Sequence, residues 1–331
     1  MELLSVTMND GVKPRSEIEG KDNSSEDKSN YKIVRKGDMV YNSMRMWQGA
    51  NGISPCDGIV SPAYTVLMPK QEINNGYFAA LFKSANLINE FRKNSQGMTS
   101  DTWNLKYPQI ETIKVQVPSV SEQDKVSELF GVLDARIVAQ AQLIEALKKY
   151  KRGLNKLVFE KITSGAKQQI PLSELCESIS SGRTTSSNAD GIFPLFGSTG
   201  VVGKTNIIEF DGDIVLIARV GANAGKVNYF SGQCAVTDNT LVIRVKENLV
   251  QAKFLAFFLE YYNLHRLIFG SGQPLVTGGQ LKKIKMPLVS LTTQVSLTQR
   301  LEALDSIIEV HEKYAQSLTL LKSGLMQQLF I

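Results

Sequence analysis

The sequence contains one long helical segment twice. The first copy covers residues 118–159 and the second covers residues 287–330. One constant offset aligns the two copies and places the following residues on their counterparts: Gln123 on Gln294, Leu133 on Leu304, Asp134 on Asp305, Ile137 on Ile308, Lys151 on Lys322, Gly153 on Gly324 and Phe159 on Phe330. A duplication of this kind determines the architecture of the whole chain, because each copy belongs to one repeated structural unit.

Both copies carry a heptad pattern, in which apolar residues alternate at spacings of three and four. This pattern predicts a helix with a narrow seam that packs on another helix. The seam positions are Phe130, Ile137, Ile144, Lys151 and Val158 with Val126, Leu133, Gln140, Leu147 and Leu154, and then Leu301, Ile308, Ala315, Lys322 and Leu329 with Leu297, Leu304, His311, Leu318 and Leu325. We expect two long helices, at about residues 121–159 and 292–330.

The charges in the seam predict the direction in which the helices pair. Parallel pairing with aligned ends would place Lys151 beside Lys322, and two like charges in one layer repel each other. Antiparallel pairing instead places Leu154 near Leu297 and Val126 near Leu325. A two-fold relation between two similar repeats also requires the antiparallel form. We therefore expect antiparallel helices.

The segments outside the helices also repeat one order of elements. The strands expected in the first are residues 3–7, 31–34, 39–41, 59–68 and 113–117, with a helix at 77–91, a polar loop at 94–100 and a solvated segment at 13–30. The second has expected strands at 193–196, 213–215, 236–242 and 284–286, a helix at 254–269 and a loop at 270–273. In this alignment Phe254 falls on Phe78 and Leu195 falls on Leu4.

The resulting fold class is α/β (α+β in arrangement), with two mixed domains separated by two long antiparallel coiled-coil helices. The expected boundaries are 1–117 for the first domain, 118–162 for the first spacer helix, 163–286 for the second domain and 287–331 for the second spacer helix. Residues 163–169 are expected to form a linker. A length of 331 residues accommodates two domains.

The second domain opens with a segment, residues 170–188, that has no counterpart in the first domain. Two interpretations remain open from the sequence. Either the chain starts inside its first domain, so that the N-terminal opening is missing, or another segment supplies the missing strand.

Composition excludes several classes of protein. The apolar runs are short and interrupted by charge, so no transmembrane helix is expected, and the N-terminus lacks the pattern of a signal peptide. Cys56, Cys176 and Cys234 lie far apart without metal-type spacing, which predicts reduced thiols in a cytoplasmic protein. A net charge of +5 is compatible with a polyanionic partner.

A search for catalytic motifs fails. Residues 197–205, GSTGVVGKT, have five residues between Gly197 and Gly203, whereas a phosphate-binding loop needs four, and the strand-like segment that follows favours a turn. The two histidines, His265 and His311, make a zinc site or a Ser/His/Asp triad improbable. The sequence also lacks a dinucleotide-binding glycine motif. We expect no catalytic residues, no metal and no cofactor.

Polar, glycine-containing loops recur at matching places in both domains. Glycine allows close approach of the backbone to a partner, and basic and amide side chains suit phosphates and base edges. For any one loop, ordinary turn composition is the better explanation, but recurrence in both domains favours a shared binding surface. The candidate DNA-binding residues are Arg45, Trp47, Gln48, Asn51, Ser181, Arg183, Thr184, Ser198, Thr199, Arg219, Asn223, Lys226, Asn239 and Gln273.

The complete pattern resembles the specificity subunit of type I restriction–modification systems. The resemblance rests on the two-domain, two-helix repeat over essentially the whole chain, with each helix opening on Pro, Gln and Asp (Pro118, Gln123, Asp134; Pro287, Gln294, Asp305) and closing on Lys-x-Gly-Leu at residues 151–154 and 322–325. It implies two target-recognition domains that read an asymmetric, bipartite site in double-stranded DNA.

The same resemblance implies the partners. The helices would act as a ruler and dock two methyltransferase subunits, with restriction/translocase subunits joining outside. Adenine methylation and ATP-dependent cleavage would belong to those partners. The spacer and docking positions assigned in this way are Phe130, Leu133, Ile137, Ile144, Leu147, Leu154, Leu301, Leu304, Ile308, Leu318 and Leu325.

Two other classes of protein compete with this hypothesis. A free-standing DNA methyltransferase or NTPase would need a catalytic tetrapeptide or a valid phosphate loop, which the sequence lacks. A coiled-coil scaffold, or a free-standing DNA-binding protein without a restriction role, accounts for the helices. It leaves the matched loops unexplained.

Overall fold

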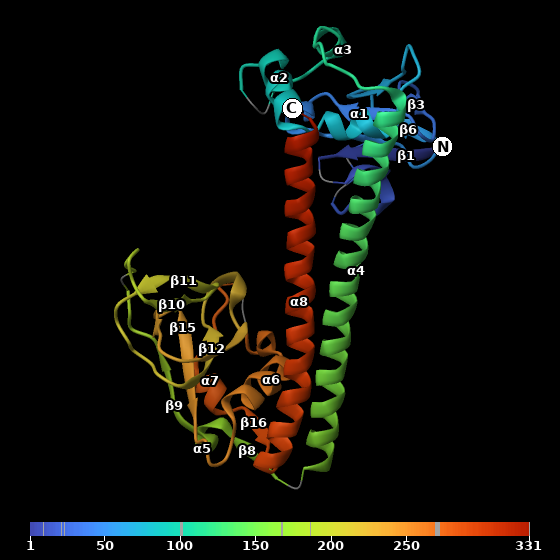
Figure 1. Ribbon diagram of the computed structural model, residues 1–331. Helices are drawn as coiled ribbons and strands as arrows, with labels where there is room; N and C mark the ends of the chain where they lie inside the picture. Colours follow the sequence, from blue (N-terminus) through green and yellow to red (C-terminus); the bar gives the residue numbers. More distant parts are fainter. Residues whose placement is uncertain are drawn as a thin grey trace. The chain divides into compact units, whose positions relative to one another are not determined.

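The computed structural model describes residues 1–8, 10–20, 22, 24–99, 102–166, 168–185, 187–268 and 272–330. The chain divides into two compact units. Unit 1 comprises Met1–Gln142 with Glu312–Ile331, and unit 2 comprises Leu143–His311. Each unit contains one mixed domain, part of the first long helix and part of the second (Figure 1). The expected segments 13–30, 94–100, 163–169, 254–269 and 270–273 each include at least one residue outside this description, namely Lys21, Asn23, Ser100, Lys167, Phe269, Gly270 and Ser271.

The two long helices are α4 (Val120–Gly165) and α8 (Leu291–Leu329). Both begin after a serine at matching repeat positions. Ser119 donates its N–H and its hydroxyl to the Glu122 carboxylate, at 3.0 and 2.7 Å, and the Ser290 hydroxyl accepts the N–H of Thr293 at 3.3 Å. Such serine caps satisfy backbone groups that lack a partner in the first helical turn. Each helix therefore begins at a serine, but the hydrogen bonds that this serine makes differ between the two.

In unit 1 the first part of α4 packs on the last part of α8. The rings of Phe130 and Phe330 stack with their centroids 5.7 Å apart, and Val126 and Leu325 contact the same hydrophobic cluster. The N-terminal part of one helix thus meets the C-terminal part of the other.

The same crossing occurs in unit 2, between the last part of α4 and the first part of α8. Lys151 Nζ lies 2.6 Å from the Asp305 carboxylate, and Leu154 and Leu297 pack against the core that contains Leu301. The prediction of antiparallel helices is confirmed.

Unit 2 contains three small sheets, and helix α6 packs on the sheet that contains β12 and β13. Its sheets have the orders β13-β12-β15-β9, β11-β10-β14 and β16-β8. The strands are β8 (Gln169–Pro171), β9 (Cys176–Ser181), β10 (Phe193–Gly197), β11 (Gly200–Thr205), β12 (Asp213–Ala218), β13 (Val227–Ser231), β14 (Ala235–Val236), β15 (Thr240–Val245) and β16 (Lys285–Pro287). The helices are α5 (Leu172–Leu175), α6 (Ala252–Tyr262), α7 (Gly278–Lys282) and the 3-10 helices Gly221–Asn223 and Leu264–Leu267.

Unit 1 has two sheets, with the orders β2-β1-β6-β3 and β5-β4-β7. The strands are β1 (Glu2–Thr7), β2 (Gly11–Pro14), β3 (Lys32–Val34), β4 (Met39–Asn42), β5 (Asn51–Ile53), β6 (Gly58–Val60) and β7 (Tyr64–Leu67). The helices are α1 (Asn75–Leu81), α2 (Ala85–Asn94), α3 (Tyr107–Ile110) and the 3-10 helices Arg15–Glu17 and Met46–Gln48.

The two units share one topology in six matching strands, β1, β2, β4, β5, β6 and β7 of unit 1 and β10, β11, β12, β13, β14 and β15 of unit 2. In unit 1, β4 pairs antiparallel with β5 and β7, and β1 pairs in parallel with β6. In unit 2, β12 pairs antiparallel with β13 and β15, and β10 pairs in parallel with β14. Even the register agrees, because Met39 opposes Leu67 as Val215 opposes Ile243. The expected duplication of the domains is thus present in the backbone.

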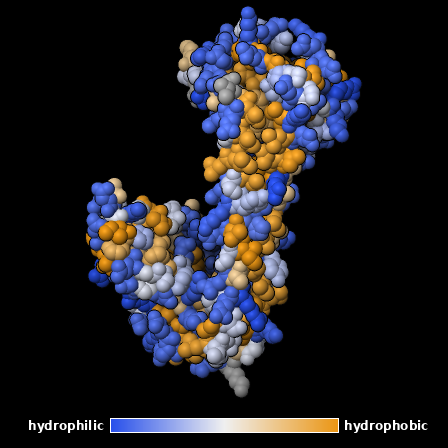
Figure 2. All heavy atoms as spheres, in the orientation of Figure 1, coloured by the Kyte–Doolittle hydropathy of each residue, from blue (hydrophilic) through white to orange (hydrophobic). Residues whose placement is uncertain are grey.

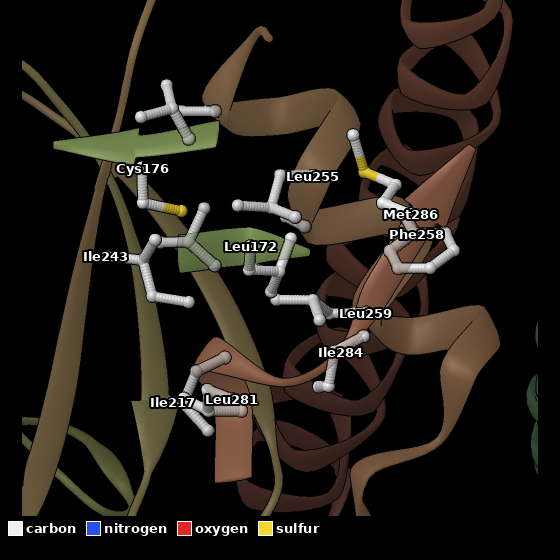
Figure 3. Close-up of a cluster of buried hydrophobic side chains, with 14 of the residues drawn as sticks. Leu172, Cys176, Ile217, Ile243, Leu255, Phe258, Leu259, Leu281, Ile284 and Met286 are labelled. Carbon is white, nitrogen blue, oxygen red and sulfur yellow. The ribbon is translucent and has the colours of Figure 1, made fainter. Parts of the chain in front are cut away.

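Each unit closes around its own hydrophobic core. In unit 2 the opening segment contributes Leu172 and Cys176, which meet side chains from β15, α6 and β16 (Figure 3). Phe159, near the end of α4, packs on Phe254 with ring centroids 5.2 Å apart. In unit 1 the repeat partner of Phe159, Phe330, packs in the same way on Tyr77, at 5.5 Å. The long helices are therefore part of each domain's core.

Two alignment details in the sequence interpretation were wrong by one residue. The N–H of Asn74 donates to Gln123 Oε1 and the N–H of Gln251 donates to Gln294 Oε1, both at 2.9 Å, so Phe254 corresponds to Tyr77 and not to Phe78. Likewise, Leu4 pairs with Val60 as Phe196 pairs with Val236, so Leu4 corresponds to Phe196 and not to Leu195. A shift of one residue in a strand exchanges its two faces.

Two expected elements are interrupted in each unit. Residues 59–68 form β6 and β7 in different sheets, because Pro62 between them lacks an N–H and occupies a turn. The corresponding residues 236–242 divide in the same way into β14 and β15. The expected helix 77–91 ends at Leu81, and a second helix starts after Ser84, whose hydroxyl accepts the N–H of Leu87 at 3.4 Å. The helix expected at 254–269 ends at Tyr262, because Asn263 adopts a left-handed conformation with φ +57°.

Four further expectations were wrong. Residues 13–14 belong to β2 and not to a solvated loop, and residues 163–165 continue α4 and not a linker. Residues 206–209 follow β11 without forming a strand, and Phe210 makes a single antiparallel bridge to Cys234. Residues 113–117 form no strand. Their counterpart β16 pairs with β8, and a strand exists only where a partner completes its hydrogen bonds.

Candidate nucleic-acid interface

The polar loops of unit 2 gather at one end of its sheets. The Arg219 N–H donates to Asn239 O at 2.9 Å, and the Val276 N–H donates to Arg219 O at 2.9 Å. Gly182, just after β9, donates its N–H to Thr240 O at 3.1 Å. Thus the end of β9, the loop after β12, the turn before β15 and the segment before α7 are joined by backbone hydrogen bonds. We call this surface the unit 2 loop cluster.

Glycine is needed where these loops approach one another. A Cβ on Gly182 would lie 2.2 Å from the Val236 carbonyl oxygen, so no larger residue fits there without a backbone shift. Gly225, in the loop after β12, has φ +86°, and its counterpart Gly49 in unit 1 has φ +84°. L-residues rarely adopt this conformation. The loops of the two units therefore share their backbone shape.

The accessible side chains of the unit 2 loop cluster are cations, amides and a hydroxyl. The exposed candidates are Arg183, Lys226, Asn239 and Gln273, and the half-buried ones are Ser181, Arg219 and Asn223. The other two candidates, the half-buried Ser198 and the exposed Thr199, lie in the turn between β10 and β11, outside this cluster. The Arg219 guanidinium donates to Asp238 O at 3.4 Å, which holds the side chain across the turn before β15. Guanidinium and ammonium groups contact phosphates or guanine, and amides pair with adenine.

One unit 2 candidate has an internal role. Thr184 is buried, and its hydroxyl donates to Glu209 Oε2 at 2.9 Å. The same carboxylate accepts the N–H of Arg183 at 2.9 Å and that of Val236 at 3.2 Å. Thr184 and Glu209 together hold the Arg183 backbone, so this site residue supports the loop instead of facing solvent.

The corresponding loop of unit 1 carries different side chains. Arg45 is exposed, and Trp47 and Gln48 are half-buried. Asn51, in contrast, is completely buried in β5, where its Nδ2 donates to Gly49 O at 3.1 Å. Asn51 is therefore a structural residue of this loop, and its side chain does not reach the surface.

Arg45 and Arg219 lie in equivalent loops but not at equivalent positions. The Ser43 N–H donates to Ala63 O, and the Leu105 N–H donates to Ser43 O, as the corresponding groups do around Arg219. Ser43 is thus the structural counterpart of Arg219, and its buried hydroxyl donates to Ala63 O at 2.5 Å. The two units present different chemistry at one common backbone site.

An aromatic cluster that sequence reasoning missed distinguishes unit 1. Trp47 meets Trp103 edge to face with ring centroids 5.2 Å apart, and the Arg92 guanidinium lies 5.8 Å from the Trp47 ring. These are the chain's two tryptophans, brought together from distant positions. The low number of tryptophans was the feature of the sequence that could have drawn attention to this cluster. Half-buried indole rings beside exposed arginines can stack on bases or sugars and contact phosphates.

The assigned docking positions fill the seams between the helices. Phe130, Leu133, Ile144, Leu301, Ile308 and Leu318 are buried, and Ile137, Leu147, Leu154, Leu304 and Leu325 are half-buried. These side chains hold the spacer together, but they offer little surface to a partner protein. These residues are therefore poorly placed to contact a partner protein.

A second row of apolar residues on the helices is exposed instead. It lies at another heptad position and consists of Leu129, Leu143, Tyr150 and Leu157 on α4, and Ile307, Tyr314 and Leu321 on α8. In unit 1 the Arg136 guanidinium lies over the Tyr314 ring at 5.6 Å, so the rows of the two helices adjoin there. Figure 2 shows hydrophobic residues gathered on the surface of the long helices. We call these residues the exposed helix rows.

The described residues contain no group of three or more His, Cys, Asp or Glu side chains that could hold a metal ion. Burial raises the pKa of Cys176 to about 12 and that of Cys234 to about 11, so both thiols stay protonated and are poor nucleophiles. None of the described helices is long and apolar enough to cross a membrane.

Comparison with known proteins gives a consistent result. The family model of the type I restriction modification DNA specificity domain matches residues 5–149 and 166–320. The specificity subunit of the type I restriction enzyme MjaVIII of Methanocaldococcus jannaschii is 25% identical over 348 residues, covering 90% of this chain and 79% of that protein. The specificity subunit of the Escherichia coli enzyme EcoprrI is 28% identical over 116 residues, covering 35% of this chain and 29% of that protein.

Solved structures show the same fold. The crystal structure of a type I restriction–modification S subunit from M. genitalium has a TM-score of 0.65 and 18% identity, over 91% of this chain and 84% of that one. A chain from a structural study of complex assembly in a type I system has a TM-score of 0.59 and 18% identity, over 92% and 84% of the two chains.

Proposed function

This chain belongs to the type I restriction–modification DNA specificity family, and from that membership we propose that its two units read the two halves of one bipartite, asymmetric DNA site. It is a DNA specificity subunit and is not catalytic, since methylation and cleavage belong to its partner subunits. The observation that carries the proposal is a comparison of the two units. The loop after β12 in unit 2 and the corresponding loop of unit 1 have the same backbone shape but carry different side chains. A shared frame with different polar groups suits recognition of two different base sequences.

In unit 2 we assign base and phosphate contacts to the unit 2 loop cluster. Arg219, fixed across the turn before β15, suits a bidentate contact to guanine, and Asn223 and Asn239 suit adenine. Arg183 and Lys226 are exposed cations of the cluster and suit phosphates. This division separates the residues that select a sequence from those that only strengthen binding.

In unit 1 the proposed contacts are of another kind. The position of Arg219 is taken by the buried Ser43, so a long cation is absent at that point of the loop. Arg45, Gln48 and the Trp47–Trp103 pair supply the accessible groups instead. We expect unit 1 to read its half-site with stacking and an amide contact, and therefore to prefer a different sequence.

The partner subunits bind elsewhere on the chain. Type I specificity subunits function in complexes with methyltransferase and restriction subunits. For this chain we propose that two methyltransferase subunits dock on the exposed helix rows, one in each unit. The repeat carries Leu143 onto Tyr314 and Tyr150 onto Leu321, so the rows provide two similar surfaces, as two copies of one partner require. Restriction subunits would join outside them.

The experiment that tests this function is a genome-wide map of methylated adenines in cells that carry the chain together with its modification subunit. We expect methylation at one bipartite sequence with two different halves separated by a fixed gap. A cell with the modification subunit alone should lack this methylation. A continuous or palindromic target, or methylation that does not depend on the chain, would contradict the proposal.

The competing hypotheses are less well supported. A scaffold without a DNA role does not account for the family match over both domains. An enzyme would need a catalytic centre, and the known function of a specificity subunit is recognition. The coiled coil and the loops are both accounted for only by the specificity-subunit function.

A further inference from the structure

A basic hollow lies in unit 2 beside the loop after β12. It has a volume of about 910 Å³, and three segments of this unit line it: α4 around Arg152, the loop at Gly225 and Lys226, and the residues after α6 that include His265. A Cβ on Gly225 would lie 3.3 Å from the His265 backbone nitrogen, so the loop and the segment after α6 are in contact. The hollow therefore extends the unit 2 loop cluster as far as the long helix. We call it the unit 2 hollow.

Cationic side chains predominate in this lining. Arg152, Lys156, Lys226 and His265 all line the hollow and are all exposed. Within the described part of the chain, the side chains of Arg152, Lys226 and His265 form no hydrogen bond and no ion pair. Lys156 Nζ lies 3.7 Å from Glu160, but both side chains are exposed, and ion pairs of this kind are weak. These four side chains are thus available to a ligand.

The hollow has a net positive charge. Among the described residues of its lining, the one carboxylate is that of Glu260, whose Oε2 lies 3.8 Å from Lys151 Nζ. This ion pair offsets the negative charge of Glu260, so the cations are not neutralised from within the hollow. A concave surface lined by one sign of charge concentrates its field and attracts ions of the opposite sign. The chemistry of the unit 2 hollow therefore suits an anionic ligand.

The matching place in unit 1 has lost these exposed cations. The helix repeat and the backbone hydrogen bonds of the loops align three of them with neutral residues: Arg152 with Ser323, Lys156 with Gln327 and Lys226 with Ala50. Unit 1 has a lysine, Lys83, at the position of Glu260, but Lys83 is half-buried and burial lowers its pKa. Exposed positive charge at this place thus distinguishes unit 2 from unit 1.

We propose that the unit 2 hollow binds the DNA backbone, with Arg152 and Lys156 of α4 holding phosphates that lie beyond the bases read by the unit 2 loop cluster. The guanidinium of Arg152 can donate two parallel hydrogen bonds to one phosphate. Lys226 belongs to both the loop cluster and the hollow, and this continuity favours DNA over an acidic segment of a partner protein. The inference rests on the proposed function and adds to it a contact of the long helix that carries no sequence information.

The test measures DNA binding by the complex of this chain with its modification subunit. Arg152→Gln removes a cation from the hollow, and Lys161→Gln removes one from the opposite face of α4, since nine residues make about two and a half turns. Arg152→Gln should weaken binding about three- to tenfold for target and non-target duplexes alike, and should reduce the slope of log affinity against log salt by about 0.9. Lys161→Gln should change neither quantity, and Arg152→Lys, which keeps the charge, should retain the slope.

Phosphate ethylation interference locates the contact. The unmodified complex should show interference at phosphates beside one half-site that is absent from the Arg152→Gln complex. The other half-site should have no corresponding contact, because Ser323 of unit 1 stands at the position of Arg152.

Unchanged affinity and salt slope in the Arg152→Gln complex, or an equal effect of Lys161→Gln, would overturn the proposal. Loss of the modification subunit from the Arg152→Gln complex in native mass spectrometry would also overturn it, since the hollow would then bind a segment of that protein. Preference of the unmodified complex for the target duplex is a separate readout of the proposed function. If this preference is present and Arg152→Gln has no effect, the inference about the hollow fails and the proposed function stands. If the preference is absent, both fail.

Discussion

Lys151 of α4 and Asp305 of α8 form an ion pair of 2.6 Å, and the same two residue types pair again in the other unit, where Lys322 of α8 meets Asp134 of α4. The sequence repeat carries Lys151 onto Lys322 and Asp134 onto Asp305. Reciprocal pairs of this kind arise when two repeats cross antiparallel. The lysines, which would repel each other in a parallel coil, each have an aspartate partner in the antiparallel arrangement.

Removing the cation should destabilise unit 2. Glu260 also lies near Lys151, at 3.8 Å, and burial raises the pKa of Glu260 while Lys151 lowers it. We expect Lys151→Ala to lower the free energy of unfolding by about 1–2 kcal/mol at neutral pH. Urea unfolding checks this value, and Lys149→Ala, at an exposed position of the same helix, serves as the control.

The same variant should show a defined pH dependence. Since the folded pKa of Glu260 exceeds its unfolded value, its contribution to stability is largest in acid and is lost as the pH rises through the folded pKa. Without Lys151 this pKa rises further. The loss caused by Lys151→Ala should therefore be smaller at about pH 4 than at neutral pH, because protonated Glu260 needs no cation. An equal loss at both pH values would show that Glu260 is not coupled to Lys151.

Gln294 should be among the most sensitive polar residues of the chain. It is fully buried, accepts the N–H of Gln251, and donates to Leu249 O and Val289 O, all at 2.9 Å. Gln294→Ala leaves three backbone groups without partners and should cost about 2–4 kcal/mol in thermal or urea unfolding. Gln299→Ala, at an exposed position later along α8, should cost less than about 0.5 kcal/mol.

Arg219 should contribute to DNA affinity in one of two distinguishable ways. If it contacts a guanine, Arg219→Ala should weaken binding by about 1–3 kcal/mol and relax the preference at one base pair. If it contacts a phosphate, binding to all sequences should weaken alike and the salt dependence should decrease. Lys246→Ala is the control, since Lys246 follows the opposite end of β15. Titrations of labelled duplexes at several salt concentrations, with the modification subunit present, measure both quantities.

An Arg219→Ala variant that matches the unmodified chain in affinity and in salt dependence would remove this residue from the interface. The same comparison applies to Arg45 in unit 1. There we expect a smaller effect on selectivity, because the counterpart of Arg219 is Ser43 and Arg45 lies two residues beyond that position.

The exposed helix rows predict the stoichiometry of the complex. Tyr150→Glu in unit 2 should remove one methyltransferase subunit, and Leu321→Glu, at the matching repeat position in unit 1, should remove the other. Native mass spectrometry of the assembled complex counts the subunits. Lys149→Glu is the matched control on α4. If either variant alone released both subunits, the two docking surfaces would not be independent.

The parts of the fold that depend on local pattern were predictable from the sequence. The heptad pattern predicted the two long helices. Lys151 and Lys322 predicted their antiparallel direction, because two lysines in one layer of a seam would repel each other. Elements that depend on distant partners were not predictable. Residues 113–117 have the composition of a strand, but β16 is a strand only because β8 lies beside it.

The candidate site divides in the same way. The glycines and the repeat predicted where the loops lie. They did not predict that Asn51 and Thr184 are buried, because that depends on contacts with Gly49 and Glu209 that the local sequence pattern does not indicate. The contact between Trp47 and Trp103 likewise joins residues far apart in the sequence. Composition identifies a polar loop, but the rest of the fold decides which of its side chains reach solvent.

The central claim is that each unit reads its own half of the target. The most direct measurement replaces residues 170–286 with the equivalent segment of another specificity subunit and maps methylated adenines in cells that contain the modification subunit. We predict that one half-site changes to the sequence of the donor while the other half-site stays the same. A change in both half-sites, or in neither, would contradict the account.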